Sequence, residues 1–102
     1  MKIVNEKEFT DEVKEGVVLV DFFATWCMPC RMMAQILEEV DGQMKDQVKI
    51  IKVDVDESPN ISRNFGVMSI PTLIIFKDGQ EQEKHIGVWQ LEDCTQALKK
   101  YL

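Results

Sequence analysis

The stretch VVLVDFFATWCMPC occupies residues 17–30 and decides the fold. Its first eight residues, Val17 to Ala24, are apolar on both faces of a strand except at Asp21, which is typical of a central sheet strand. A helical pattern begins after Cys30, with apolar residues at spacings of three and four. These residues are Met33, Ile36, Leu37, Val40 and Met44. The stretch therefore predicts a buried strand that leads into an amphipathic helix, with two cysteines at the junction.

The segment before this stretch predicts a short strand and a helix. Lys2 to Val4 is interpreted as the strand. Asn5 and Glu8 have the spacing of a capping box, in which each side chain accepts a hydrogen bond from the other residue's backbone N–H. Gly16 is expected to end this first helix.

The segment after the central stretch alternates in the same way. We expect a strand over residues 48–55, and then a short helix that Ser58 caps, with Pro59 at its first position. A strand over residues 71–77 leads into an Asp78-Gly79 hairpin turn and a return strand over residues 81–87. The last helix carries its apolar residues on one stripe, at Leu91, Cys94, Leu98 and Tyr101.

The order of elements is thus strand, helix, strand, helix, strand, helix, strand, strand, helix. Strands that alternate with helices predict parallel pairing through right-handed crossovers, and the closing hairpin adds an antiparallel edge. We predict the α/β class, with a mixed sheet between helices. The chain has 102 residues, which suits a single domain over residues 1–102.

The composition excludes several classes of protein. Lys and Arg number 12 against 18 Asp and Glu, and the resulting net charge of −6 argues against nucleic acid as a partner. No apolar run approaches the roughly 18 residues that a membrane span needs. The segment Met1 to Glu6 turns polar at once, unlike a secretory signal. We therefore expect a cytoplasmic protein without a membrane partner, with a monomer as the default state.

The Cys27-Met28-Pro29-Cys30 segment carries the candidate chemistry. The first turn of a helix presents free N–H groups and the positive end of the helix dipole, and both favour a thiolate at Cys27. A thiolate is the nucleophile of disulfide exchange. One helical turn places Cys30 within bonding reach, so that it can resolve a mixed disulfide. Half of a zinc site is the alternative, but only Cys94 and His85 remain as further ligands of the usual type.

Asp21 and Lys52 are candidates for proton transfer. Both faces of the strand around Asp21 consist of apolar residues, so burial should raise the pKa of this carboxyl group. A proton acceptor for Cys30 is the favoured role, and a carboxylate turned toward solvent is the alternative. Lys52, on the adjacent predicted strand, would partly neutralise Asp21. A solvated strand lysine is a nearly equal alternative.

Two further places are candidate contacts for a substrate. Backbone at Ile70-Pro71 can pair with an extended segment, although residue preferences alone favour an ordinary trans Pro at a strand start. Trp26 offers a flat apolar surface beside Cys27, or else belongs to the core. Trp89 is interpreted as core or interface, and Cys94 as a small buried hydrophobe.

These residues together resemble the thioredoxin family over essentially the whole chain. Trp26 to Cys30 is similar to the WCGPC motif, Val20 to Ala24 to the VDFWA strand, and Lys52 to Asp56 to the KxxxD strand. Ser69-Ile70-Pro71-Thr72 matches the segment that carries a cis proline, Phe76 to Gly79 matches the turn after it, and Gly87 matches a glycine near the substrate groove.

The resemblance implies a sheet order of 1-3-2-4-5 with two helices on each face. It implies a protein-disulfide reductase with Cys27 as attacking thiolate, Cys30 as resolving thiol, and Asp21 with Lys52 as support for proton transfer. A thioredoxin reductase would supply the electrons, and the redox-active Cys27-Cys30 disulfide would need no bound cofactor or metal. The implied contacts with protein substrates are Trp26, Met28, Pro29, Ile70, Pro71 and Gly87.

The chain departs from the family pattern at three positions. Met28 replaces a usual Gly, and residues between the cysteines influence the balance of dithiol and disulfide. Phe23 replaces a usual Trp and removes an indole N–H. Gln35 stands where many members have Pro, which predicts a straighter helix. An oxidase or isomerase of the same fold, and a redox-inert adaptor that binds through Trp26, remain as alternatives.

Overall fold

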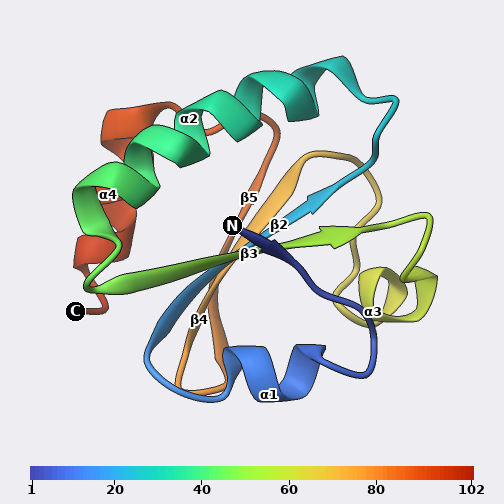
Figure 1. Ribbon diagram of the computed structural model, residues 1–102, viewed down its shortest axis with the longest axis horizontal. Helices are drawn as coiled ribbons and strands as arrows, with labels where there is room; N and C mark the ends of the chain where they lie inside the picture. The colour runs from blue at the N-terminus through green and yellow to red at the C-terminus, as the bar shows by residue number, and fades with distance from the viewer.

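The computed structural model describes residues 1–102 and contains five strands and four helices in the predicted order (Figure 1). The strands are β1 (Lys2–Ile3), β2 (Val17–Phe23), β3 (Val48–Asp54), β4 (Thr72–Lys77) and β5 (Gln80–Ile86). The helices are α1 (Phe9–Val13), α2 (Met28–Met44), α3 (Pro59–Asn64) and α4 (Leu91–Lys99).

The strands form one mixed sheet in the order β1-β3-β2-β4-β5, which confirms the expected order. Strands β1 and β2 pair with β3 in parallel, while β4 is antiparallel to β2 and β5 is antiparallel to β4. Strand β2 therefore lies at the centre, and all seven of its residues are buried.

The prediction of parallel pairing was wrong for β4, which runs antiparallel to β2. Asp54, the last residue of β3, stands opposite Phe23, and Thr72, the first residue of β4, stands opposite Phe22. Helix α3 and the loop after it therefore return the chain to the end of the sheet where β3 finished. The alternation of strands and helices does not determine to which end of the sheet a connection returns.

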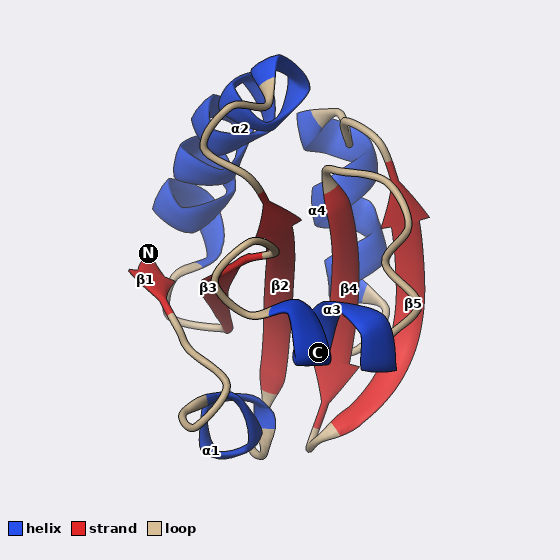
Figure 2. Cartoon of the chain, turned by 90° about the vertical axis from the view of Figure 1, so that its right-hand side faces the viewer, coloured by secondary structure: helices blue, strands red, loops and turns tan.

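Each face of the sheet is covered by two helices (Figure 2). Helices α2 and α4 pack on one face, where buried residues such as Leu37 and Leu98 meet Leu19 of β2. Helices α1 and α3 cover the other face, where Phe9 meets Val18. Because successive strand residues point to opposite faces, β2 contributes to both cores, as its continuous apolar sequence predicts.

The helix ends follow the sequence signals in part. The backbone N–H of Asn5 donates to Glu8 Oε1 at 3.0 Å and the N–H of Glu8 donates to Asn5 Oδ1 at 3.0 Å, which confirms the capping box before α1. Ser58 occupies the position before α3, but its side chain makes no capping hydrogen bond. Helix α2 runs through Gln35 without interruption.

Several single-residue expectations concern the core. Trp89 and Cys94 are buried in the core beneath α2 and α4, as predicted. Of the neighbouring Met32 and Met33, only Met33 is buried, and Met32 is 59% exposed. No helix combines the length and the apolar character that crossing a bilayer requires.

Candidate active site

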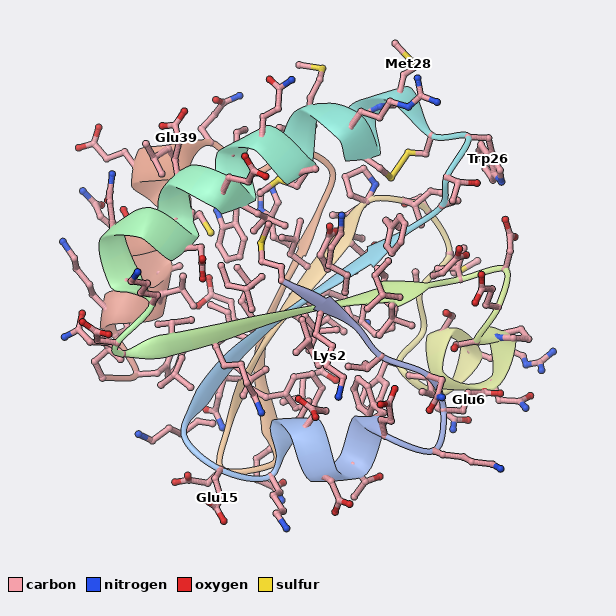
Figure 3. The ribbon with its side chains drawn as sticks, viewed as in Figure 1. Lys2, Glu6, Glu15, Trp26, Met28 and Glu39 are labelled. Carbon is pink, nitrogen blue, oxygen red and sulfur yellow. A yellow bond between two sulfur atoms is a disulfide. The ribbon has the colours of Figure 1, made fainter.

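The two cysteines lie where β2 ends and α2 begins, and a disulfide joins their sulfur atoms. Figure 3 shows this bond beside the first turn of α2, near Trp26 and Met28. Cys27 is the N-cap residue of α2, and the backbone N–H of Cys30 donates to Cys27 Sγ at 3.2 Å. A helix start that already donates to this sulfur is suited to stabilise it as an anion after reduction.

The residues around the disulfide differ sharply in exposure. Cys27 and Cys30 are 4% and 3% exposed, whereas Trp26 and Met28 are 67% and 65% exposed. Arg31 donates to the Thr25 carbonyl oxygen at 3.3 Å and contacts Met28 Sδ at 3.6 Å. The disulfide is thus recessed within a rim of larger side chains. Sequence reasoning overlooked Arg31, because a single arginine on a helix carries no signal of its own.

Asp21 is completely buried, so the alternative of a carboxylate turned toward solvent is wrong. Neither carboxylate oxygen has a hydrogen-bond partner in the protein. Burial raises the pKa of Asp21 to about 7, and the positive charge of Lys52 opposes this rise. A carboxyl group with this pKa can both accept and release a proton near neutral pH.

Lys52 pairs with Asp21 in the register of β2 and β3 but makes no ion pair with it. Its Nζ lies 4.5 Å from the centre of the Phe23 ring instead. The side chain is only partly exposed, so it is not the freely solvated lysine of the alternative. Phe23, Cys30 and Lys52 line the same hollow of about 230 Å³.

The Ile70-Pro71 segment lies directly beside Cys27. The peptide bond between these two residues is cis, which corrects the trans bond that residue preferences favoured. Cys27 Sγ is 3.9 Å from the Ile70 carbonyl oxygen. The N–H of Gly87 donates to the Pro71 carbonyl oxygen at 2.8 Å, so the structure brings Gly87 to this segment as well.

Trp26 lies over an apolar hollow of about 180 Å³ next to the disulfide. The indole Nε1–H donates to Asp56 Oδ2 at 2.9 Å, which fixes the ring at the surface and excludes the reading of Trp26 as core. Met68, which is 97% exposed, lies in a loop without a periodic pattern, so the sequence alone did not indicate it. The hollow is lined by Trp26, Val55, Val67, Met68, Ser69 and Ile70.

The residues that the zinc alternative requires are engaged elsewhere. The His85 imidazole stacks on Trp89 with ring centres 4.6 Å apart, and Cys94 is buried in the core. No three His, Cys, Asp or Glu side chains are grouped so that they could hold a metal ion. Burial also raises the pKa of Cys94 to about 12, so this thiol is a poor nucleophile.

A disulfide at the start of a helix, a buried carboxyl group and an adjacent proline segment define a dithiol–disulfide oxidoreductase. Comparisons with known proteins agree. The thioredoxin family model matches residues 1–100. The chain is 47% identical over 102 residues to a thioredoxin of Listeria monocytogenes, covering all of this chain and 99% of the relative. It is 46% identical over 97 residues to a thioredoxin of Bacillus subtilis, covering 95% of this chain and 93% of the relative.

A solved structure extends this likeness to three dimensions. A mutant thioredoxin from Halobacterium salinarum NRC-1 superposes with a TM-score of 0.90 at 30% identity, covering 99% of this chain and 88% of the other. The chain belongs to the thioredoxin family. It is a thiol–disulfide oxidoreductase that reduces protein disulfides, and thioredoxin reductase is the standard partner that recycles such proteins.

Proposed function

We propose that Cys27 is the attacking residue and Cys30 the resolving residue of this protein-disulfide reductase. The observation that carries the proposal is the position of Cys27 Sγ, which caps α2 and accepts the N–H of Cys30. In the reduced protein the Cys27 thiolate attacks a substrate disulfide, and the first substrate sulfur leaves as a thiolate that takes up a proton. The Cys30 thiolate then attacks Cys27 Sγ in the mixed disulfide. The second substrate thiolate leaves, and two electrons have passed to the substrate.

Asp21 is proposed to take the proton from Cys30 in the second step. This carboxyl group is buried on the same face of the sheet as α2, and its pKa of about 7 lets it accept a proton near neutral pH. Lys52 is proposed to support the transfer, because a positive charge close to a buried carboxylate stabilises its ionised form.

The proposed contacts with substrate surround the recessed disulfide. Trp26, Met28 and Pro29 are exposed around Cys27 and offer apolar surface. Ile70 and Pro71 lie on the other side of the sulfur, with Gly87 hydrogen-bonded to Pro71. An extended substrate segment between these two sides would place its disulfide against Cys27.

We further propose that residues 1–102 act as one domain and as a monomer, in the cytoplasm. A thioredoxin reductase would return two electrons to the Cys27-Cys30 disulfide, with no cofactor held by this chain itself. Protein disulfides, and neither nucleic acid nor membrane, are the proposed partners. The net charge of −6 supports the exclusion of nucleic acid.

Turnover of a protein disulfide such as that of insulin tests the assignment. We expect Cys27→Ser and Cys30→Ser each to abolish catalytic reduction, because each removes one of the two sulfurs that must form the product disulfide. Cys94→Ser is the matched control and should retain turnover, since Cys94 is buried away from the site. Sustained turnover by Cys30→Ser would exclude the resolving role of Cys30.

A further inference from the structure

Phe23 has no role in the exchange reaction described above, yet it lies next to the groups that carry it. It follows Asp21 by two residues on β2, so both side chains point to the face of the sheet that α2 covers. Lys52 stands opposite Asp21 in the parallel register of β2 and β3 and points to the same face. Three side chains on two adjacent strands therefore converge below the first turn of α2.

The Lys52 ammonium contacts the ring and not the carboxylate. Its Nζ is 4.5 Å from the Phe23 ring centre, within the roughly 6 Å range of a cation–π interaction. Both Asp21 oxygens lack any hydrogen-bond partner in the protein. Asp21 is completely buried and Lys52 is partly exposed, so an ammonium released from the ring would extend into water rather than lose its hydration to form a buried ion pair. The ring therefore determines where this charge lies.

The Lys52 ammonium lies at a hollow that Cys30 also lines, so its position places a positive charge near the resolving sulfur. Phe23, Lys52 and Cys30 line one space of about 230 Å³, large enough for several water molecules. Arg31 is the other charged residue on this lining, but its guanidinium is engaged with Thr25 and Met28. Lys52 is therefore the charge that is free to act on both Asp21 and the resolving sulfur.

We propose that Phe23 is a positioning residue whose ring holds the Lys52 ammonium at the hollow beside Cys30, where its charge acts on Asp21 without an ion pair. An ion pair would keep Asp21 ionised and hinder its uptake of a proton from Cys30, whereas a solvated Lys52 would leave Asp21 without a compensating charge. The ring holds the ammonium close enough to Asp21 for its charge to act on the carboxyl group, but without a direct ion pair. The proposal rests on the proton-transfer role of Asp21 and Lys52, and it assigns Phe23 as the residue that sets the effect of Lys52 on the proton affinity of Asp21.

The groups that face Asp21 are few, which makes the proposal testable by titration. Lys52 on β3 is the one charge that acts on the pKa of Asp21, and Leu73 is its neighbour on β4. Cys27 and Cys30, on the α2 side, do not titrate while they form a disulfide. A titration of the oxidised protein therefore reports on Asp21 and its relation to Lys52 alone.

The experiment measures the carboxyl titration of Asp21 by carbon NMR in the oxidised protein. We expect Phe23→Leu to raise the proton affinity of Asp21 about two- to fivefold, the equivalent of one lost cation–π contact. Phe23→Trp should lower the proton affinity, because the indole ring holds a cation more strongly. Both effects should vanish in a Lys52→Met background. Phe22→Leu is the matched control, since Phe22 is buried on the opposite face.

The outcomes separate the proposal from its alternatives. An unchanged or lowered proton affinity in Phe23→Leu would overturn it, and so would an equal rise in the Lys52→Met background, which would indicate general repacking. If Phe23→Leu does not fold, Phe23→Trp alone decides. The proposal is then overturned if the proton affinity of Asp21 does not decrease in Phe23→Trp, or if it decreases equally in the Lys52→Met background. Asp21→Asn tests the proton-transfer role separately. If Asp21 does not take the proton from Cys30, this variant resolves mixed disulfides at the normal rate, whereas the effects of Phe23 on the titration of Asp21 remain.

Discussion

Asp21 is the residue at which folding and chemistry conflict most directly. A carboxyl group without a partner in the core is costly to ionise, and here burial raises its pKa to about 7. Because the unfolded chain has an ordinary carboxyl pKa near 3.8, the folded state binds an extra proton between these two values. Stability must therefore fall as the pH rises through this range, and above about pH 7 the full cost of the charge is present.

Substitution of Asp21 by Asn tests this linkage. We expect the variant to lose the pH dependence between about pH 4 and 7, so that its stability relative to the wild type increases with pH, by at most about 4 kcal/mol. The unpartnered amide of Asn costs the same at every pH and does not change the slope. Denaturant unfolding at a series of pH values measures the effect. Parallel pH profiles of the two proteins would show that Asp21 is not responsible.

The burial of Asp21 could be predicted because its neighbours on both faces of the strand are apolar. The contact of Lys52 with Phe23 could not, since it depends on the register of β2 against β3 and on a choice between a ring and a carboxylate. Residue preferences also did not predict the cis bond before Pro71. The free energies of the cis and trans isomers differ little, so the surrounding fold determines which isomer forms. Only the family resemblance indicated it.

At the scale of elements, α2 connects the active site to the core. Cys27 caps this helix and Cys30 lies in its first turn. Its buried residues Met33, Leu37 and Val40 fix the helix against the sheet. The periodicity of the sequence predicted this helix and its buried stripe. The direction of β4 was not predictable from the alternation of elements alone, because it depends on the end of the sheet to which α3 and the following loop return the chain.

Replacement of Leu37 by Ala tests how strongly α2 depends on the core. Leu37 is fully buried, so we expect a loss of about 2–5 kcal/mol in the free energy of unfolding. Glu38→Ala, one position along on the exposed side of the helix, should change it little. Chemical denaturation of both variants makes the comparison. Equal effects at the two positions would contradict the described packing of the helix.

At the scale of the whole molecule, the site is formed where distant segments meet at one end of the sheet. The junction of β2 and α2 provides the sulfurs, the loop before β4 provides Ile70 and Pro71, and Gly87 follows β5. The central position of β2 in the sheet makes this convergence possible, because its end is adjacent to both neighbouring strands.

Trapping of the reaction intermediate tests the central claim most directly. A Cys30→Ser, Cys94→Ser protein keeps only Cys27, and after exposure to a disulfide-containing protein it should accumulate one mixed disulfide, which peptide mass spectrometry would locate at Cys27. The matched Cys27→Ser, Cys94→Ser protein should accumulate far less, because Cys27, and not Cys30, caps the helix, where backbone N–H groups stabilise a thiolate. Preferential capture of substrate by Cys30 would contradict the account.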